Sequence, residues 1–195
     1  FSALAGLVPA ALLAQHTLAI HEAVKLHPTE DGALLLLGKS ADKVDALKLL
    51  EDVPELAASD EDNAIMVRAR LGEVAAETAL LRAYQAAQDA EERGALALRL
   101  GYAATPRLIE LLASEIRSAQ HYVWNMRSRR SLRVHIVAGL HLAFPTEPVF
   151  WKPFFTPNSD AYYEVVEAWL KQHLGTTWPT PRPEFLYEEQ APSGR

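Results

Sequence analysis

The sequence predicts an all-α protein in which helical hairpins stack into a superhelix, and three observations lead to this prediction. A phrase ending in Leu-Gly recurs at 36–38, 70–72 and 99–101, and a diverged copy, Leu-His-Leu-Ala, stands at 140–143. Each copy closes an Ala- and Leu-rich helical stretch, and another apolar helical stretch follows, as in stacked helical solenoids. No segment alternates apolar and polar residues over the length of a strand, so no sheet is expected.

The first residues allow two interpretations. Residues 1–14 are apolar and uncharged, which is typical of the end of a signal peptide's hydrophobic core. Their apolar side chains also follow helical spacing, which favours an amphipathic first helix beginning near Val8 and Pro9. Gln15 and His16 interrupt the apolar run before the ~20 residues that a membrane span needs, so no span is expected.

The next helices are marked by their ends. Residues 33–37 and 44–50 form an early pair that ends near Pro54. Ser59, followed by three acidic residues, has the pattern of an N-cap with a negatively charged first turn, which suits the helix dipole. Gly72 follows the last turn of that helix and supplies its left-handed residue.

The middle of the chain contains two strong start signals. After a helix expected over 75–87, Asp89 and Glu92 have the spacing of a capping box. Thr105 followed by Pro106 combines a cap with proline at the first helical position. The helix that these two residues open is expected to bury Leu108, Leu111, Leu112 and Ile116.

The last third mixes helices with irregular segments. Residues 118–130 show no period and are expected to form a linker, and a helix follows over 131–143. Residues 144–158 hold four prolines and five aromatic residues, which predicts an ordered but irregular connection. A final helix is expected from 159 or 160 to 174.

The organisation is that of one helical domain with a tail. The chain of 195 residues is of single-domain size, and 49% of it is hydrophobic, so it can bury a core. We place the domain at 1–175 and an extended Pro-rich tail at 176–195. The aromatic residues that crowd the last third are expected to cap the end of the superhelix.

Composition also limits the function. The net charge is −6, which argues against nucleic-acid binding because such proteins carry a basic face. There is no cysteine, so thiolate metal sites and cysteine nucleophiles are excluded. A cytoplasmic location is expected, with the periplasm or export as the alternative.

Several phrases resemble a known family. Residues 69–81 and 98–112, in which an Ala/Leu helix reaches Leu-Gly and a Leu-rich helix returns, resemble bacterial HEAT repeats of the type found in phycobilisome lyases. Residues 131–140 are similar to the helix of such a repeat that contains Val-Arg and ends in Ala-Leu. The resemblance covers about 32–143 and implies an α-α superhelix whose concave face binds another protein.

The candidate binding residues are arginines and aromatic residues. Four arginines lie within 127–133, and thirteen of the sixteen aromatic residues follow residue 120. Exposed aromatic residues beside arginine are typical of interface hot spots. The alternatives are a solvated loop with an intramolecular pair at Arg133, and aromatic side chains buried in the cap. The predicted partner-binding residues are Tyr122, Trp124, Arg127, Arg129, Arg130, Arg133, Trp151 and Trp178.

No catalytic pattern accompanies these residues. The sequence has no phosphate loop and no nucleophile elbow, and its closest histidine pairs are spaced five and six residues apart, which suits no zinc helix. We therefore expect no catalytic residue, metal or cofactor, and a non-catalytic adaptor or accessory subunit that binds another protein. The alternatives are an enzyme on the same scaffold, similar to a bilin lyase, and a membrane-peripheral protein.

Overall fold

The computed structural model describes residues 10–28, 31–57, 62–118, 121–125, 128–151 and 160–178. These residues are mostly helical, so the predicted all-α class fits. The helices are α1 (Ala10–Gln15), α2 (Thr17–Leu26), α3 (Asp31–Leu37), α4 (Lys43–Asp52), α5 (Pro54–Ala57), α6 (Asp62–Leu71), α7 (Val74–Ala86), α8 (Ala90–Ala103), α9 (Pro106–Ser114), α10 (Leu132–Ala143) and α11 (Asp160–Leu174). Two short 3-10 helices, η2 (Glu115–Arg117) and η3 (Pro148–Phe150), and two strands, β1 (His121–Asn125) and β2 (Ser128–Ser131), join them.

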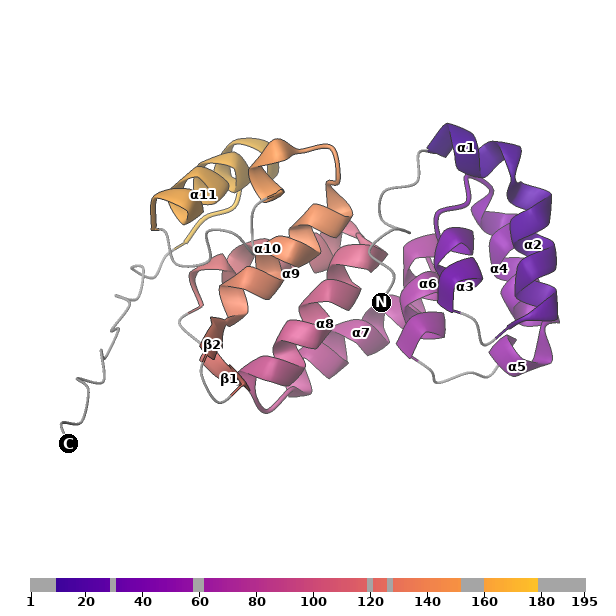
Figure 1. The fold of residues 1–195 in the computed structure, drawn as a ribbon, viewed down its shortest axis with the longest axis horizontal. Helices are drawn as coiled ribbons and strands as arrows, with labels where there is room; N and C mark the ends of the chain where they lie inside the picture. Colours follow the sequence, from indigo (N-terminus) through magenta and orange to yellow (C-terminus); the bar gives the residue numbers. More distant parts are fainter. Residues whose placement is uncertain are drawn as a thin grey trace.

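The helices gather around two hydrophobic clusters. Helices α1 to α6 lie at one end of the molecule, and α8 to α11 lie at the other (Figure 1). The N-terminal cluster consists of buried side chains between Val24 and Leu71, together with Tyr102 of α8. The C-terminal cluster consists of buried side chains between Ala76 and Leu170, together with Ala69 of α6. Helices α6 and α8 therefore contribute to both clusters and join the two ends.

Three of the predicted helix ends are confirmed. The Asp89 carboxylate accepts the backbone N–H groups of Glu91 and Glu92, and the Glu92 side chain reaches back to accept the N–H of Gln88, one residue before the cap, in a variant of the capping box. Thr105 caps α9, with Pro106 at its start. Gly72 has a φ of +105° after the last turn of α6, a conformation that favours glycine because it has no Cβ.

The third Leu-Gly phrase does not end a helix, contrary to the prediction. Gly101 lies inside α8, which continues to Ala103 and ends at Ala104 in the left-handed conformation. The reason for Gly101 is packing: a Cβ there would overlap the backbone of Gly139 in α10, and a Cβ on Gly139 would overlap the carbonyl of Ala97. Helices α8 and α10 thus cross in backbone contact, which only residues without a side chain permit.

A small sheet replaces the predicted linker. Residues 118–130 were expected to lack structure and the chain to lack strands, but β1 and β2 pair antiparallel, with an irregularity in register between Val123 and Asn125. The pairing joins Tyr122 to Arg130 and Val123 to Arg129. A two-stranded ribbon needs no long alternating pattern, because its backbone hydrogen bonds and the helices beside it stabilise it.

None of the described helices has the length and the apolar composition needed to cross a membrane.

Candidate functional site

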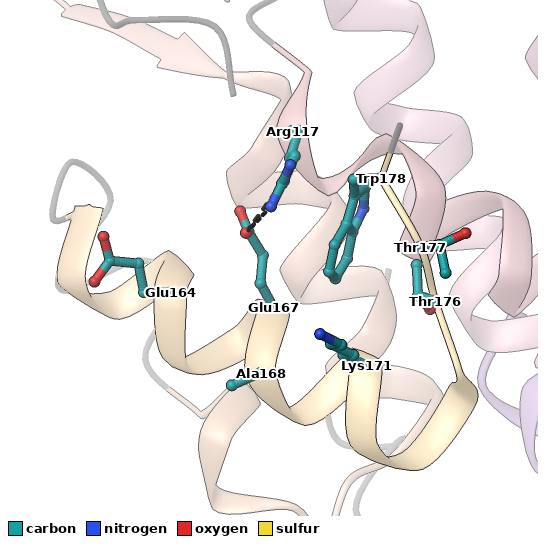
Figure 2. Close-up of a pocket in the computed structure, with 8 residues that line it drawn as sticks. All are labelled: Arg117, Glu164, Glu167, Ala168, Lys171, Thr176, Thr177 and Trp178. Atoms are coloured by element: carbon teal, nitrogen blue, oxygen red, sulfur yellow. Dashed lines mark hydrogen bonds and ion pairs between the residues drawn. The ribbon is translucent and has the colours of Figure 1, made fainter. Parts of the chain in front are cut away.

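A cleft of about 390 Å³ lies between α11, η2 and the segment that follows α11. Its size is within the range of small-molecule sites. Figure 2 shows Glu167 and Lys171 of α11 on the side of the helix that faces Arg117 and Trp178. The lining residues are Arg117, Glu164, Glu167, Ala168, Lys171, Thr176, Thr177 and Trp178.

Helix α11 supplies one wall of the cleft because of its amphipathic pattern. Its buried residues Val166 and Leu170 pack into the C-terminal cluster. Glu164, Ala168 and Lys171 follow one another at helical spacing on an exposed face. Burial of one face of the helix therefore turns a carboxylate, a methyl group and an ammonium toward the cleft.

An ion pair between η2 and α11 sits at the middle of the cleft. Arg117 donates to Oε2 of Glu167 from Nη2 at 2.9 Å and from Nε at 3.2 Å. Glu167 is 8% exposed, and the ion pair compensates for the burial of its carboxylate. Two donors to one oxygen hold the guanidinium in a single orientation, which fixes η2 against α11 (Figure 2).

Trp178 forms the opposite wall and is held by two contacts. Its Nε1 donates to the Ala113 carbonyl at 3.3 Å, and the guanidinium carbon of Arg117 lies 4.7 Å from the centre of its ring. The chain reaches this position because Gly175, with a φ of +65°, turns it after α11. The predicted binding residue Trp178 is thus a half-buried, fixed wall of the cleft.

The groups in the cleft suit an amphipathic ligand. The indole supplies an apolar surface, Thr176 and Thr177 contribute to the lining, and Lys171 is exposed and forms no ion pair with any residue that the structure describes. Such a set binds by stacking, hydrogen bonding and charge. No group of three or more His, Asp or Glu side chains among the described residues is arranged to hold a metal ion.

Arg133 is not on a surface, which corrects its prediction as a binding residue. Its side chain is 1% exposed, and its guanidinium carbon lies 3.6 Å from the centre of the Tyr163 ring. Ser131 caps α10 by accepting the Arg133 backbone N–H at 3.3 Å, so the helix begins there and turns the side chain inward. A planar guanidinium stacks on an aromatic face more favourably than an ammonium does.

For the other predicted binding residues before residue 132, the structure describes the backbone, which lies in the two strands. Tyr122 and Trp124 lie in β1, and Arg129 and Arg130 lie in β2. Arg127 lies outside the described residues. The role of these residues in binding stays a prediction.

Three of the aromatic residues between 144 and 169 pack on one another. The rings of Phe144, Phe150 and Trp169 lie 4.9 to 6.0 Å apart, and Phe150 is fully buried. Trp151 differs, because it is 55% exposed and its Nε1 donates to the Pro145 carbonyl at 3.0 Å. The interpretation of this crowding as buried packing holds for Phe150, and Trp169 is partly buried against the same cluster, whereas Trp151 remains accessible away from the cleft.

Most of the cleft was missed by the sequence analysis. Arg117 and Glu167 are 50 residues apart, and no local pattern connects them. The spacing of Glu164, Ala168 and Lys171 on one helix face was available, but such spacing is also typical of a solvated face.

Comparison with known proteins gave no relative: no family model matches the chain, and no curated protein or solved structure was found to be similar.

Proposed function

We propose that the protein is a non-catalytic interaction module that binds a segment of another protein in the cleft between α11 and Trp178, as an adaptor or accessory subunit of a larger assembly. The fixed indole of Trp178 beside the Arg117–Glu167 ion pair is the observation that carries the proposal. Preorganised tryptophan and arginine side chains are the commonest energetic centres of protein interfaces.

The architecture supports this role. Consecutive helices pack against each other, α6 on α7 and α8 on α9, as they do in a stack of HEAT-like hairpins. Stacks of this kind act by presenting a surface to a partner. In this proposal the cleft lies at the C-terminal end of the stack.

The charges and the apolar surface of the cleft indicate which kind of partner segment would bind there. Glu167 neutralises Arg117, and Lys171 adds a positive charge at the edge of the cleft. A segment with one bulky apolar side chain against the indole and a carboxylate near Lys171 is complementary to this arrangement. Aromatic or aliphatic residues next to Asp or Glu are therefore the expected ligand sequence.

Selection of random peptides displayed on phage tests the proposal without knowledge of the partner. Peptides enriched on the wild type are expected to carry an acidic residue beside an apolar one. Their affinity should fall at least about tenfold in Trp178→Ala, because truncation of a central tryptophan costs that much. It should also fall in Lys171→Glu, which changes only an exposed side chain.

Two matched variants serve as controls. Trp151→Ala removes an exposed tryptophan away from the cleft, and Lys48→Glu reverses an exposed charge on α4. Both should bind the selected peptides as the wild type does, and circular dichroism checks that Trp178→Ala remains folded. Peptides that bind Trp178→Ala and Lys171→Glu as tightly as the wild type would place the interaction elsewhere. Enrichment of no peptide would overturn the proposal.

A further inference from the structure

A second polar site lies where the two hydrophobic clusters meet, around the ring of Tyr102. Tyr102 projects from α8 into the N-terminal cluster and is 2% exposed. Its hydroxyl donates to the Leu35 carbonyl in α3. A Cβ on Gly38 would overlap that hydroxyl, so the chain after α3 passes directly against the ring.

Two basic residues from different elements lie at the two sides of the Tyr102 ring, one in contact with it and one next in the chain to a residue that contacts it. The guanidinium carbon of Arg70, near the end of α6, lies 5.1 Å from the centre of the Tyr102 ring, and its Nη1 donates to the Tyr102 carbonyl. Lys39 follows Gly38, the residue that lies against the Tyr102 hydroxyl. We call this place, where the two hydrophobic clusters meet around Tyr102, the seam. An arginine from α6 and a lysine from the end of α3 therefore lie at the seam.

These two cations lack the acidic partners that neighbouring arginines have. Arg68 pairs with Glu73 at 3.0 Å, and Arg99 pairs with Asp62. Among the residues that the structure describes, no carboxylate pairs with Arg70 or Lys39, although the chain holds 25 acidic residues against 19 basic ones. Two like charges that act on each other in half-buried positions repel, and an anion between them removes that repulsion.

The protonation of the pair agrees with this geometry. Burial and, to a lesser degree, the charge of Arg70 lower the pKa of Lys39 to about 8. Burial also lowers the pKa of Arg70. An anion shared by the two groups would counter both effects, because it favours their charged forms.

We propose that Lys39 and Arg70 bind a small oxyanion at the seam between the two clusters, a phosphate or carboxylate group held by the guanidinium and the ammonium. Arg70 is kept in place by the Tyr102 ring and carbonyl, and its remaining N–H groups donate to the anion. A guanidinium matches the spacing of two oxygens of such a group, and the ammonium adds a third donor.

Nuclear magnetic resonance with inorganic phosphate tests the site. Phosphate is titrated into the ¹⁵N-labelled protein at neutral pH and constant ionic strength, with chloride as the balancing ion, because screening alone shifts exposed signals. The Arg70 side-chain Nε–H signal and the Lys39 amide signal are expected to move along saturating curves. Acetate in a second titration distinguishes the source of the oxygens: saturation by acetate as well extends the site to carboxylates, and saturation by phosphate alone restricts it to phosphate.

Variants of Lys39 decide whether the pair forms the site. Lys39→Met keeps the aliphatic stem and removes the charge, and it should weaken phosphate binding at least about tenfold, the effect of one charge-assisted hydrogen bond. Lys39→Arg should retain binding, as should the control Lys48→Met on α4. Shifts that rise linearly without saturation, or equal saturation in Lys39→Met and the wild type, would overturn the proposal.

Discussion

The two ends of the molecule are held together by different kinds of contact. The N-terminal cluster is built from Leu, Val, Ala and Met side chains around one tyrosine. In the C-terminal cluster, by contrast, α8 and α10 touch through their backbones at Gly101 and Gly139, and the cluster also contains three buried aromatic rings. Aliphatic side chains can shift rotamers to absorb a change in volume, whereas two backbones in contact cannot. The C-terminal end is therefore expected to tolerate substitution less.

The substitution with the largest expected effect is Gly101→Ala. The new methyl group would overlap the Gly139 carbonyl, so α8 and α10 would have to separate. We expect a loss of more than about 3 kcal/mol in the free energy of unfolding, the upper end of overpacking costs, because backbone must move. Urea denaturation measures this loss.

Gly32→Ala is the matched control for that experiment. Gly32 lies in α3 of the N-terminal end, where a Cβ would meet nothing within 4 Å. Alanine there should raise stability by up to about 1 kcal/mol through helix propensity. Equal effects of the two substitutions would contradict the difference between the two ends.

Tyr102→Phe tests how the ends are joined. It removes the hydroxyl that donates to the Leu35 carbonyl and leaves that acceptor buried, which should cost about 1–3 kcal/mol. All four tryptophans follow residue 120, so tryptophan fluorescence reports on the C-terminal end, while far-ultraviolet circular dichroism reports on all the helices. In urea the two signals should change together in the wild type, and circular dichroism should change first in the variant.

The N-caps of α4 and α8 allow a comparison between the two ends in which the expected changes in stability are smaller. Asp42 accepts one backbone N–H, that of Asp45, whereas Asp89 accepts two. Replacement of a capping Asp by Ala costs about 0.5–2 kcal/mol, and Asp89→Ala is expected to lie above Asp42→Ala within that range. Thermal unfolding of the two variants checks the order, and a reversed order would mean that cap geometry does not set the cost.

Local features of the fold were predictable from the sequence, and contacts between distant elements were not. The caps at Asp89 and Thr105 and the turn at Gly72 were predicted, because each depends on a few adjacent residues. Gly101 has the same local sequence as Gly72, namely Arg-Leu-Gly, but serves a helix crossing whose partner, Gly139, is 38 residues away. Local sequence cannot distinguish a glycine that ends a helix from one that allows close packing.

In the candidate site, too, some residues were predictable from the sequence and others depended on contacts between distant elements. Trp178 was predicted as a binding residue and lines the cleft, since tryptophan in an extended segment needs a surface to cover it. Arg133 was predicted on a surface but stacks under Tyr163 in the core. The clustering of arginines in sequence does not reveal that one of them begins a buried helix. Arg117 and Glu167 were not found at all, because their pairing depends on how α11 docks.

The smallest effect concerns the pH dependence of stability at the seam. Lys39 has a pKa of about 8 in the folded protein, against an ordinary value of 10.5. Between these values the unfolded chain binds a proton at Lys39 that the folded chain has released, so stability rises with pH across that window. The stability of the wild type relative to Lys39→Met should therefore increase from about pH 7.5 to about pH 9.5, by less than about 1 kcal/mol because solvent screens the ammonium. Urea unfolding of both proteins across this range measures the difference, below the pH at which tyrosines of the unfolded chain ionise. A difference that stays flat or falls would mean that Lys39 is as well solvated in the folded protein as in the unfolded chain, and that the seam imposes no cost on its charge.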